Sequence, residues 1–281
     1  MMFGASLSVK LADFQFVLKS PKAPAIGLFC QFLLLPLTTF GVTQVLDVDP
    51  SMALGMILVA SCPGGTFSNI MTWLARGHLA TSLSMTGIST LAALVMTPLN
   101  FSLYASLDPD TRAMLAEITV EPWEIMNLIL MVLVIPLILG MIVGNKFPNI
   151  VQQLDRPFRW LSMLLFLAFV AIAFSANGDL FVQYARLFVG LVVLHNAIAL
   201  LLGYVSSRLI KLNDEQARAV TLEVGIQNSG LGLIIVFNFF PNLGGMMIIT
   251  AFWGVWHLVS GLSLALFWSK KPIPKVAPGI Q

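Results

Sequence analysis

The amino-acid sequence predicts an all-α integral membrane protein, and three observations support this fold class. The chain has 281 residues, of which 58% are hydrophobic and only 10% are charged, and its mean hydropathy is +0.90. Soluble domains carry roughly 25% charged residues. Apolar runs of about 20 residues, the length that a helix needs to cross a bilayer, recur along the chain. Two of these runs contain helix-breaking residues near their middles.

Eight apolar runs predict eight membrane spans. Their hydrophobic residues lie all round the helix rather than in alternation, which disfavours a barrel of strands. The net charge of +2 is then an effect of membrane topology and indicates no nucleic-acid partner. The predicted spans cover residues 24–42, 52–75, 80–104, 125–144, 159–176, 183–205, 216–238 and 246–268.

The basic residues predict the orientation of the chain, because Lys and Arg collect in cytoplasmic loops. When the connections between the eight spans are assigned to alternate sides, all of the 15 Lys and Arg residues except Arg112 and Arg186 fall on one side. That side is predicted to be the cytoplasm, and the tail at 269–281 lies on it. The acidic connection at 107–124 then faces outward. The expected location is the inner (plasma) membrane.

Two spans are predicted to be broken helices. In "ASCPGGTFSN" (60–69), Pro63 lacks an amide hydrogen and the glycines Gly64 and Gly65 tolerate positive φ, so the helix should stop and restart at about Thr66. In "EVGIQNSGLG" (223–232), the glycines at 225 and 230 are expected to do the same. Unwound backbone inside a bilayer is tolerated only where protein covers it or where it lines a wet cavity.

The two breaks indicate an internal repeat. The shift along the chain that carries Asn69 onto Asn228 also carries the span at 24–42 onto 183–201. The first-repeat helices would occupy 24–104, an external connection 105–124 and the second-repeat helices 125–268. An odd number of helices in each copy inverts the second copy relative to the first. Paired breaks in two halves are the sequence feature that marks the binding site of a secondary transporter.

The repeat also makes the first copy short. Residues 1–23 are expected to be the remnant of a second helix and its cytoplasmic connection, with about one and a half helices preceding them in a longer reading frame. A degenerate first copy is the alternative.

Glu223 is the main candidate functional residue, because a carboxylate at mid-membrane is costly and is a functional hypothesis by default. Its alternative is a protonated acid bonded to a neighbouring helix. Oxygen ligands from carboxylate, amide, hydroxyl and carbonyl groups suit hard cations such as sodium. Further oxygens come from Ser68, Asn69 and from a one-sided stripe of hydroxyls at Ser82, Thr86 and Ser89, although such a stripe is also typical of helix packing.

Three other polar positions have weaker patterns. Gln31 is the one strongly polar residue in "GLFCQFLLLPL", where an interhelical hydrogen bond is the alternative. His257 and the pair His195–Asn196 are candidates for lining the same cavity, although isolated histidines in apolar helices are more often packed core residues. No pattern of a protease, an ATPase or a hydrolase is present, so the sequence predicts no enzyme.

With "CPGGTFSN" (62–69), the hydroxyl stripe and "EVGIQN" (223–228) together, the chain resembles the bile acid:sodium symporter family. The resemblance covers nearly the whole chain, including "LADFQFVLKSPKAPAIGLFCQFLLLP" (11–36). It implies an inverted-repeat fold with two crossing broken helices, divided into a panel domain and a core domain. It also implies two sodium sites, the first with Ser68, Asn69, Ser82, Thr86 and Glu223, the second with Gln31, Gln227, Glu223 and the carbonyls of Val224 and Ile226.

The resemblance implies symport of sodium with an organic anion by alternating access, and the half-helix N-termini near Thr66 and Gln227 would face the anion. Thr66, Asn228 and His257 are the substrate candidates. Steroid-like anions, small 2-keto acids and pantothenate are the substrates implied. Relatives similar to bacterial bile acid transporters carry Trp-His-Asn in the last helix. Leu258 replaces that Asn here, which favours a small anion.

Two other functions stay open at the level of sequence. A sodium/proton antiporter would use Glu223 as its proton carrier and would need no organic substrate. A membrane sensor, or an inactive truncated transporter, would not transport at all.

Overall fold

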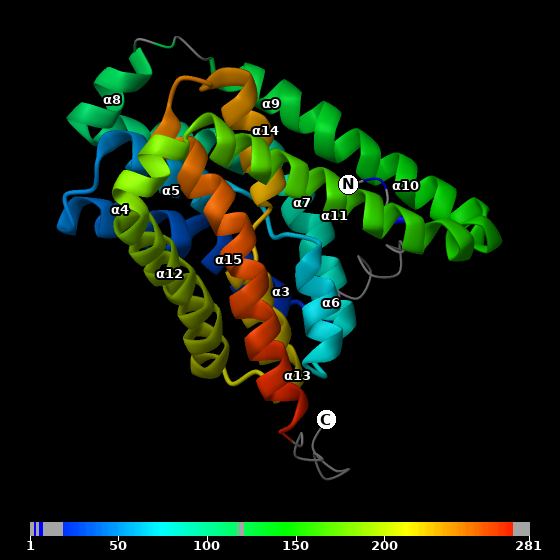
Figure 1. Ribbon diagram of the computed structural model, residues 1–281. Helices are drawn as coiled ribbons and strands as arrows, with labels where there is room; N and C mark the ends of the chain where they lie inside the picture. Colours follow the sequence, from blue (N-terminus) through cyan, green and yellow to red (C-terminus); the bar gives the residue numbers. More distant parts are fainter. Residues whose placement is uncertain (1–2, 4–5, 8–18, 117, 119–120, 272–281) are drawn as a thin grey trace.

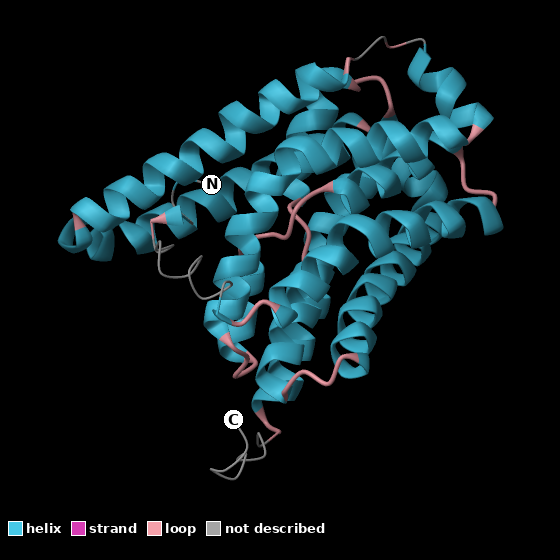
Figure 2. Cartoon of the chain, turned by 180° about the vertical axis from the view of Figure 1, so that it is seen from behind, coloured by secondary structure: helices cyan, strands magenta, loops and turns pink. Residues whose placement is uncertain are grey.

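The computed structural model describes residues 3, 6–7, 19–116, 118 and 121–271. Within these ranges the chain is helical apart from turns, loops and one isolated β-bridge (Figures 1 and 2), so the predicted all-α class is confirmed. Most of the segment 1–23 and of the tail 269–281 lies outside the described residues. The helices are α3 (Lys22–Phe29), η1 (Cys30–Leu34), α4 (Leu35–Val45), α5 (Pro50–Ser61), α6 (Phe67–Leu74), α7 (Leu79–Leu107), α8 (Pro109–Ala116), α9 (Pro122–Ile129), η2 (Leu130–Val134), α10 (Ile135–Lys146), α11 (Pro148–Ala176), α12 (Gly178–Leu209), α13 (Asp214–Gly225), α14 (Ser229–Phe239) and α15 (Gly244–Ser269).

Each of the eight predicted spans falls on helix. Among the described residues, five helices are long and apolar enough to cross a membrane: Lys22–Val45, Leu79–Leu107, Pro122–Lys146, Val182–Leu209 and Gly244–Ser269. The other three predicted spans contain shorter apolar helices at Pro50–Ser61, Met163–Ala176 and Ser229–Phe239. Two of those three are the spans that the sequence predicts to be broken. The chain is therefore a multi-pass membrane protein.

The first span contains a π-helical turn, η1, between α3 and α4. Pro36 has no amide hydrogen to donate to the carbonyl of Phe32, four residues earlier. The side-chain amide of Asn100, on α7, donates to that carbonyl instead at 2.8 Å. Such turns occur frequently at functional sites, and Gln31 lies in this one.

The first broken helix stops at Ser61 and restarts at Phe67, with Thr66 as the N-cap residue of α6. The carbonyls that the break leaves free are satisfied by side chains from other helices. Thr97 donates to the carbonyl of Ser61 at 2.7 Å, and Gln31 donates to that of Cys62 at 2.8 Å. Because lipid offers no hydrogen bonds, these donors are what makes the break tolerable at membrane depth.

The second broken helix stops at Gly225 and restarts at Ser229. Asn228 caps α14, since its side-chain oxygen accepts the N–H of Leu231 at 3.1 Å. The freed carbonyl of Gly225 accepts a hydrogen bond from Asn196, on α12, at 2.8 Å. Both breaks are thus covered by protein, as the sequence requires.

The two breaks cross and pair with each other. Gly65 donates its N–H to the carbonyl of Ile226 at 2.6 Å, and Asn228 donates to that of Pro63 at 2.8 Å. These bonds flank the antiparallel bridge between Gly64 and Gln227. In Figure 1, α6 and α13 extend from the crossing toward the end of the molecule that holds the C-terminus, and α5 and α14 extend toward the other end.

The crossing corrects two details of the sequence analysis. None of the described glycines has a positive φ. Gly64 and Gly65 are instead needed for close approach, because a Cβ on Gly64 would lie 2.4 Å from Glu223 Oε1 and one on Gly65 would lie 2.7 Å from the carbonyl oxygen of Gln227. The register between the halves also differs, since Gly64 pairs with Gln227, whereas the shift that carries Asn69 onto Asn228 would carry Gly64 onto Glu223.

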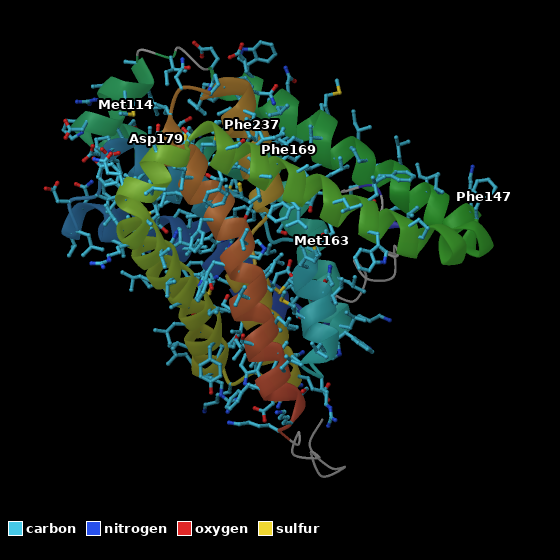
Figure 3. All side chains as sticks on the ribbon, viewed as in Figure 1. Met114, Phe147, Met163, Phe169, Asp179 and Phe237 are labelled. Atoms are coloured by element: carbon cyan, nitrogen blue, oxygen red, sulfur yellow. The ribbon has the colours of Figure 1, made fainter. Side chains whose placement is uncertain are left out.

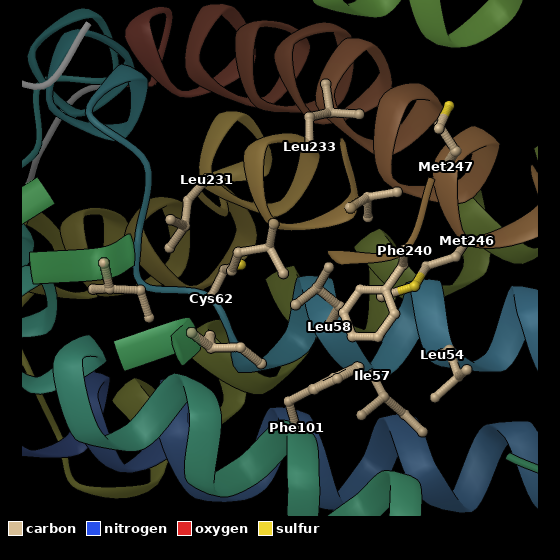
Figure 4. Packing of buried hydrophobic residues seen from close by; sticks show 14 of the residues in the cluster. Leu54, Ile57, Leu58, Cys62, Phe101, Leu231, Leu233, Phe240, Met246 and Met247 are labelled. Carbon is tan, nitrogen blue, oxygen red and sulfur yellow. The ribbon is translucent and has the colours of Figure 1, made fainter. Parts of the chain in front are cut away.

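Buried apolar side chains surround the crossing (Figure 4). Leu58 and Cys62 from the first broken helix pack with Leu231 and Leu233 from the second, and the rings of Phe101 and Phe240 meet edge to face at 5.6 Å. Inside a bilayer this packing stabilises through van der Waals contact rather than through exclusion of water, since lipid tails are as apolar as the side chains. The crossing is therefore held by close packing on its apolar sides and by hydrogen bonds at the breaks.

Candidate functional site

Glu223 lies in a buried cluster of oxygen atoms just below the crossing. Its Oε2 accepts hydrogen bonds from Ser68 at 2.5 Å and from Ser82 at 3.1 Å, and its Oε1 accepts one from Thr86 at 2.7 Å. The side-chain oxygen of Asn69 lies 2.8 Å from Ser82 Oγ and 3.3 Å from Thr86 Oγ1. The structure thus brings together the five side chains predicted for the first sodium site, from α6, α7 and α13. We call them the Glu223 cluster.

The Glu223 cluster has more hydrogen-bond acceptors than hydroxyl protons to donate to them. The single hydroxyl proton of Ser82 faces two acceptors, on Asn69 and Glu223. The proton of Thr86 faces three, which are those same two side chains and the carbonyl of Ser82. Within the described part of the chain, no Lys or Arg forms an ion pair with Glu223. A hard cation fits this donor set because every candidate ligand is oxygen.

Transition-metal chemistry has no comparable donor set here. Among the described residues, no group of three or more His, Cys, Asp and Glu side chains is placed to hold a metal ion. Transition metals prefer imidazole and thiolate ligands. The cluster therefore favours an alkali or alkaline-earth cation.

A second polar group lies beside the breaks and contains Gln31, Gln227 and the carbonyl of Val224. Gln31 Nε2 donates to Gln227 Oε1 at 2.5 Å, and Gln227 Nε2 donates to the Val224 carbonyl at 2.7 Å. The side-chain oxygen of Gln31 is buried without a hydrogen-bond partner. The carbonyl of Ile226 accepts the N–H of Gly65. An unpaired buried carbonyl oxygen is costly, and it fits a cation ligand.

A cavity of about 210 Å³ lies on the other face of the crossing. The three substrate candidates, Thr66, Asn228 and His257, all line it. Two of them are the N-cap residues of α6 and α14, so two helix N-termini, which carry partial positive charge, face this cavity. His257 is buried and its Nδ1 lies 3.3 Å from Ser229 Oγ.

The opposite wall of the cavity is apolar and comes from η2 and α11. It contains Leu133, Phe166 and Phe169. Figure 3 shows Phe169 beside Phe237 of α14, and their ring centroids are 5.9 Å apart. Gly254 makes room for this wall, because a Cβ there would lie 2.4 Å from the ring of Phe166. The cavity thus has a polar wall at the crossing and an apolar, partly aromatic wall opposite it.

Three residues singled out by the sequence lie elsewhere. His195 does not line the cavity, because its Nε2 lies 2.7 Å from Thr39 Oγ1 and its ring packs against Trp253. Asn196 holds the carbonyl of Gly225. Ser89 donates to the carbonyl of Thr86 at 3.1 Å and lies almost two turns beyond Ser82 along α7. His195 and Asn196 are neighbours in sequence but have different partners, because one position along a helix rotates a side chain by about 100°.

Sequence reasoning missed several supporting residues. Thr72 donates to Ser82 at 3.3 Å, and its position one turn after Ser68 was a usable signal. Asn100 and Thr97 hold freed carbonyls, but their partners are distant in sequence and no local pattern identifies them. The aromatic wall on α11 could not be predicted from the sequence either, because Phe166 has the pattern of a lipid-facing residue.

Comparison with known families assigns this architecture. The family model described as the sodium bile acid symporter family matches residues 1–184. The chain belongs to this family. The resemblance that the broken spans and the Glu223 motif carry is thereby confirmed.

Relatives in the sodium bile acid symporter family span bacteria, plants and animals. YocS of Bacillus subtilis (strain 168), described as an uncharacterized sodium-dependent transporter, is 36% identical over 98% of this chain and 83% of its own length. A probable sodium/metabolite cotransporter of Arabidopsis thaliana chloroplasts, BASS1, is 30% identical over 98% of this chain and 66% of its own. The human ileal sodium/bile acid cotransporter is 28% identical over 86% and 68%.

These relatives support sodium-dependent transport as the general activity of the family. They are described as transporters and cotransporters rather than as enzymes. Their described substrates differ, since a metabolite is named for one and bile acid for another. The family therefore implies the use of sodium, and the substrate has to be argued from the cavity.

Proposed function

We propose that this protein imports a small organic anion together with sodium by alternating access. The observation that carries the proposal is that the crossing lies between the Glu223 cluster and the cavity. Gly64 contacts Glu223 on one side, and Gly65 lines the cavity on the other. Binding at either place acts on the same short stretch of backbone.

The proposal assigns two sodium ions to the two polar groups. The first sodium would be held by the Glu223 cluster, with the carboxylate supplying the negative charge. The second would be held by Gln31, Gln227 and Glu223 with the carbonyls of Val224 and Ile226. The unpaired oxygen of Gln31 supports this second assignment. Sodium binding would tie α6, α7 and α13 together and order the crossing.

The anion would bind in the cavity with its charged group toward the crossing. The N-termini of α6 and α14 carry partial positive charge, which favours an anion. The side-chain amide of Asn228 and the imidazole of His257 add polar contacts. A cavity of about 210 Å³ is below the roughly 300–1,000 Å³ of sites for drug-sized ligands. This volume favours an anion smaller than a steroid, with an apolar body that packs against Phe166 and Phe169.

The membrane potential would then drive uptake. Two sodium ions with one monoanion carry one net positive charge inward, and each charge gains about 2.3 kcal/mol per 100 mV. Import requires the C-terminus to be cytoplasmic in an inner membrane, as the basic residues predict. The turns that follow α6 and α12 support this, because they lie at the end of the molecule that holds the C-terminus (Figure 1) and contain or adjoin Arg76, Arg208 and Lys211.

The proposal includes the inverted repeat with its panel and core domains. The paired bonds at the crossing support it: the shift that carries Gly64 onto Gln227 also carries Pro63 onto Ile226 and Gly65 onto Asn228, so each bond maps onto the other. Such an exchange is what a two-fold relation between the halves requires. The crossing helices with α3, α7, α12 and α15 would form the core, and α9 to α11 would belong to the panel.

Uptake of labelled organic anions into proteoliposomes tests the proposed function. We expect accumulation with an inward sodium gradient, none when potassium replaces sodium, and none for Glu223→Gln. Ser89→Ala is the control, because it removes a hydroxyl of α7, the helix of Ser82 and Thr86, that donates to the carbonyl of Thr86 rather than to Glu223, and it should retain uptake. Uptake that is the same in sodium and in potassium would refute the proposal. Sodium flux driven by a pH gradient without organic substrate would instead indicate an antiporter.

A further inference from the structure

Arg218 is a buried charge that the proposed transport does not use. Among the residues whose burial the structure describes, Arg218 and Glu223 are the only buried members of the Asp, Glu, Lys and Arg class, with 6% and 1% of their surfaces exposed. Both lie on α13. They do not pair with each other, because five positions along a helix place their side chains about 140° apart around the axis.

The partners of Arg218 are backbone carbonyls at the ends of two other helices. Its Nη1 donates to the carbonyl of Ala75, the C-cap residue of α6, at 2.7 Å. The same nitrogen lies 3.2 Å from the carbonyl of Trp268, and Nη2 lies 3.5 Å from that of Lys271, both at the end of α15. The guanidinium also lies over the Trp268 ring, at 5.9 Å. Helix C-termini carry partial negative charge, so they attract a cation without any acid.

Two of the helices that Arg218 joins, α6 and α13, carry proposed sodium ligands. α6 has only eight residues and presents Ser68 and Asn69 in its first turn. At the crossing, Gly65, next to the N-cap residue Thr66, donates its N–H to the carbonyl of Ile226. At its other end, Arg218 holds the carbonyl of Ala75, and the N–H of His78 bonds the carbonyl of Glu215 at 2.9 Å. The short helix is thus fixed to α13 at both ends, and Glu223 lies between the two fixed points.

We propose that Arg218 is a positioning residue for sodium. By holding the far end of α6 against α13, it keeps Ser68 and Asn69 at ligand distance from Glu223. This inference rests on the proposed sodium binding at the Glu223 cluster and goes beyond it, since Arg218 touches none of the proposed ligands.

A guanidinium suits this position better than any other side chain. It presents five N–H donors in a fixed plane and can serve two helix ends at once, whereas the ammonium of Lys is a compact point charge. The partners of Arg218 are backbone carbonyls, which remain when the side chain is replaced, so an apolar residue here would leave them without their donor. Arg218 is therefore expected to contribute to stability, and a test of positioning has to separate sodium affinity from stability.

The test measures the sodium dependence of thermal stability for the purified full chain in detergent, with potassium keeping the ionic strength constant. Sodium that binds the folded state raises the melting temperature. For Arg218→Met we expect the sodium concentration at half-maximal shift to rise about 10- to 100-fold, the range expected for lost hydrogen bonds to a charged group. Arg218→Lys should raise it less. Arg208→Met is the matched control, because Arg208 is exposed and pairs with Asp214 at the surface, and it should change nothing.

The outcomes separate this inference from the proposed function. A purely structural Arg218 would lower the melting temperature equally in sodium and potassium and leave the half-maximal concentration within about twofold of the wild type, which overturns the inference alone. A wild-type protein with no sodium-induced shift overturns both proposals. Should Arg218→Met fail to yield folded protein, Arg218→Lys decides: a threefold or larger increase supports the inference, and no increase overturns it.

Discussion

On one side of the crossing, Gln31 donates to the carbonyl of Cys62, and on the other side Asn196 donates to the carbonyl of Gly225. The shift that carries Gly64 onto its bridge partner Gln227 also carries Cys62 onto Gly225, so the two carbonyls are counterparts. A carboxamide thus satisfies the end of each broken helix. Both halves meet the same requirement, since a free carbonyl at membrane depth must find a donor.

The chemistry of the two sides is different. The same shift relates the proposed ligands Glu223, Ser68 and Thr86 to counterparts that are all buried and apolar, which are Ala60, Leu231 and Ile249 respectively. The Glu223 cluster therefore has no polar counterpart at the place to which the shift carries it. In the proposed function, the paired backbone of the two breaks supplies a place where an ion can bind, and only the side chains of α6, α7 and α13 supply ligands.

The largest effect should come from adding one methyl group at the crossing. A Cβ on Gly64 would lie 2.4 Å from Glu223 Oε1, whereas one on Gly232, on the apolar side, would lie 2.8 Å from a side-chain methyl of Thr250. A displaced ligand group costs about 100-fold in function. We expect Gly64→Ala to lower sodium-driven uptake by about that factor, while Gly232→Ala stays within about threefold. Equal losses in the two variants would show that the sides do not differ.

The two carboxamides provide a finer comparison. Gln31→Ala and Asn196→Ala should each lower stability by about 1 kcal/mol or more, because each leaves a buried backbone carbonyl without its donor, and Gln31→Ala also removes the donor of Gln227 Oε1. Only Gln31→Ala should also raise the sodium concentration needed for half-maximal uptake. The reason is that Gln31 has an unpaired oxygen, whereas the oxygen of Asn196 accepts a hydrogen bond from Ser260. Thermal melting and sodium titration of uptake measure the two effects separately, and an equal sodium response would remove Gln31 from the second site.

A substitution in the cavity should separate the anion from sodium. The shift that relates the two sides pairs His257 with Leu94, a partly buried residue of the apolar packing. His257→Leu gives the cavity the residue of its counterpart and removes one polar contact. We expect the KM for the anion to rise about tenfold, the effect of one hydrogen bond, at unchanged sodium dependence. Uptake kinetics at saturating sodium measure it, with Leu94→Met as the control. An unchanged KM would exclude His257 from substrate contact.

The smallest effect is expected outside both regions, at the cap of α8. Asp108 accepts the N–H groups of Thr111 and Asp110 at 2.9 Å and the side chain of Gln44 at 2.9 Å. The bond from Thr111, followed by that from Gln44, holds the pKa of this carboxyl below its usual value. Because folding lowers this pKa, the ionised Asp108 stabilises the folded state at pH values above the pKa of an unfolded Asp, which is about 3.9. This stabilisation is lost as the pH falls through the lower pKa of the folded state.

Asp108→Ala should therefore weaken α8 by about 0.5–2 kcal/mol at neutral pH. Hydrogen exchange of residues 109–116 should be faster in the variant at neutral pH, and the difference should shrink as the pH falls below about 4. Uptake should be unaffected. A difference that persists at acid pH would mean that the charge of Asp108 does not matter.

Much of the site could be predicted because its residues have local patterns. A carboxylate in an apolar span is costly enough to stand out, and hydroxyls one helical turn apart on α7 had to share a face. The pattern "DPDT" at 108–111 also had the features of a capped helix start, although residues 105–124 were predicted only as a connection. Local chemistry was sufficient wherever the partner lay within one or two turns.

The errors have one physical cause, which is that the partner lies far away in the chain. Gly64 and Gly65 permit positive φ, but Glu223 and Gln227 require small residues there, and only the fold shows this. Asn69 and Asn228 are alike in sequence, yet one is the third residue of α6 and the other is the N-cap of α14. His195 looked like a cavity residue until the structure placed it beside Thr39 and Trp253.

Residues 64–65 form the strip of backbone that lies between the Glu223 cluster and the cavity. In the proposed function, any change of this strip would alter sodium binding and substrate binding together. The far wall of the cavity, which contains Leu133, Phe166 and Phe169, lies away from the Glu223 cluster. Related transporters with the proposed function would therefore change their substrate through residues of η2 and α11, while keeping the same sodium sites.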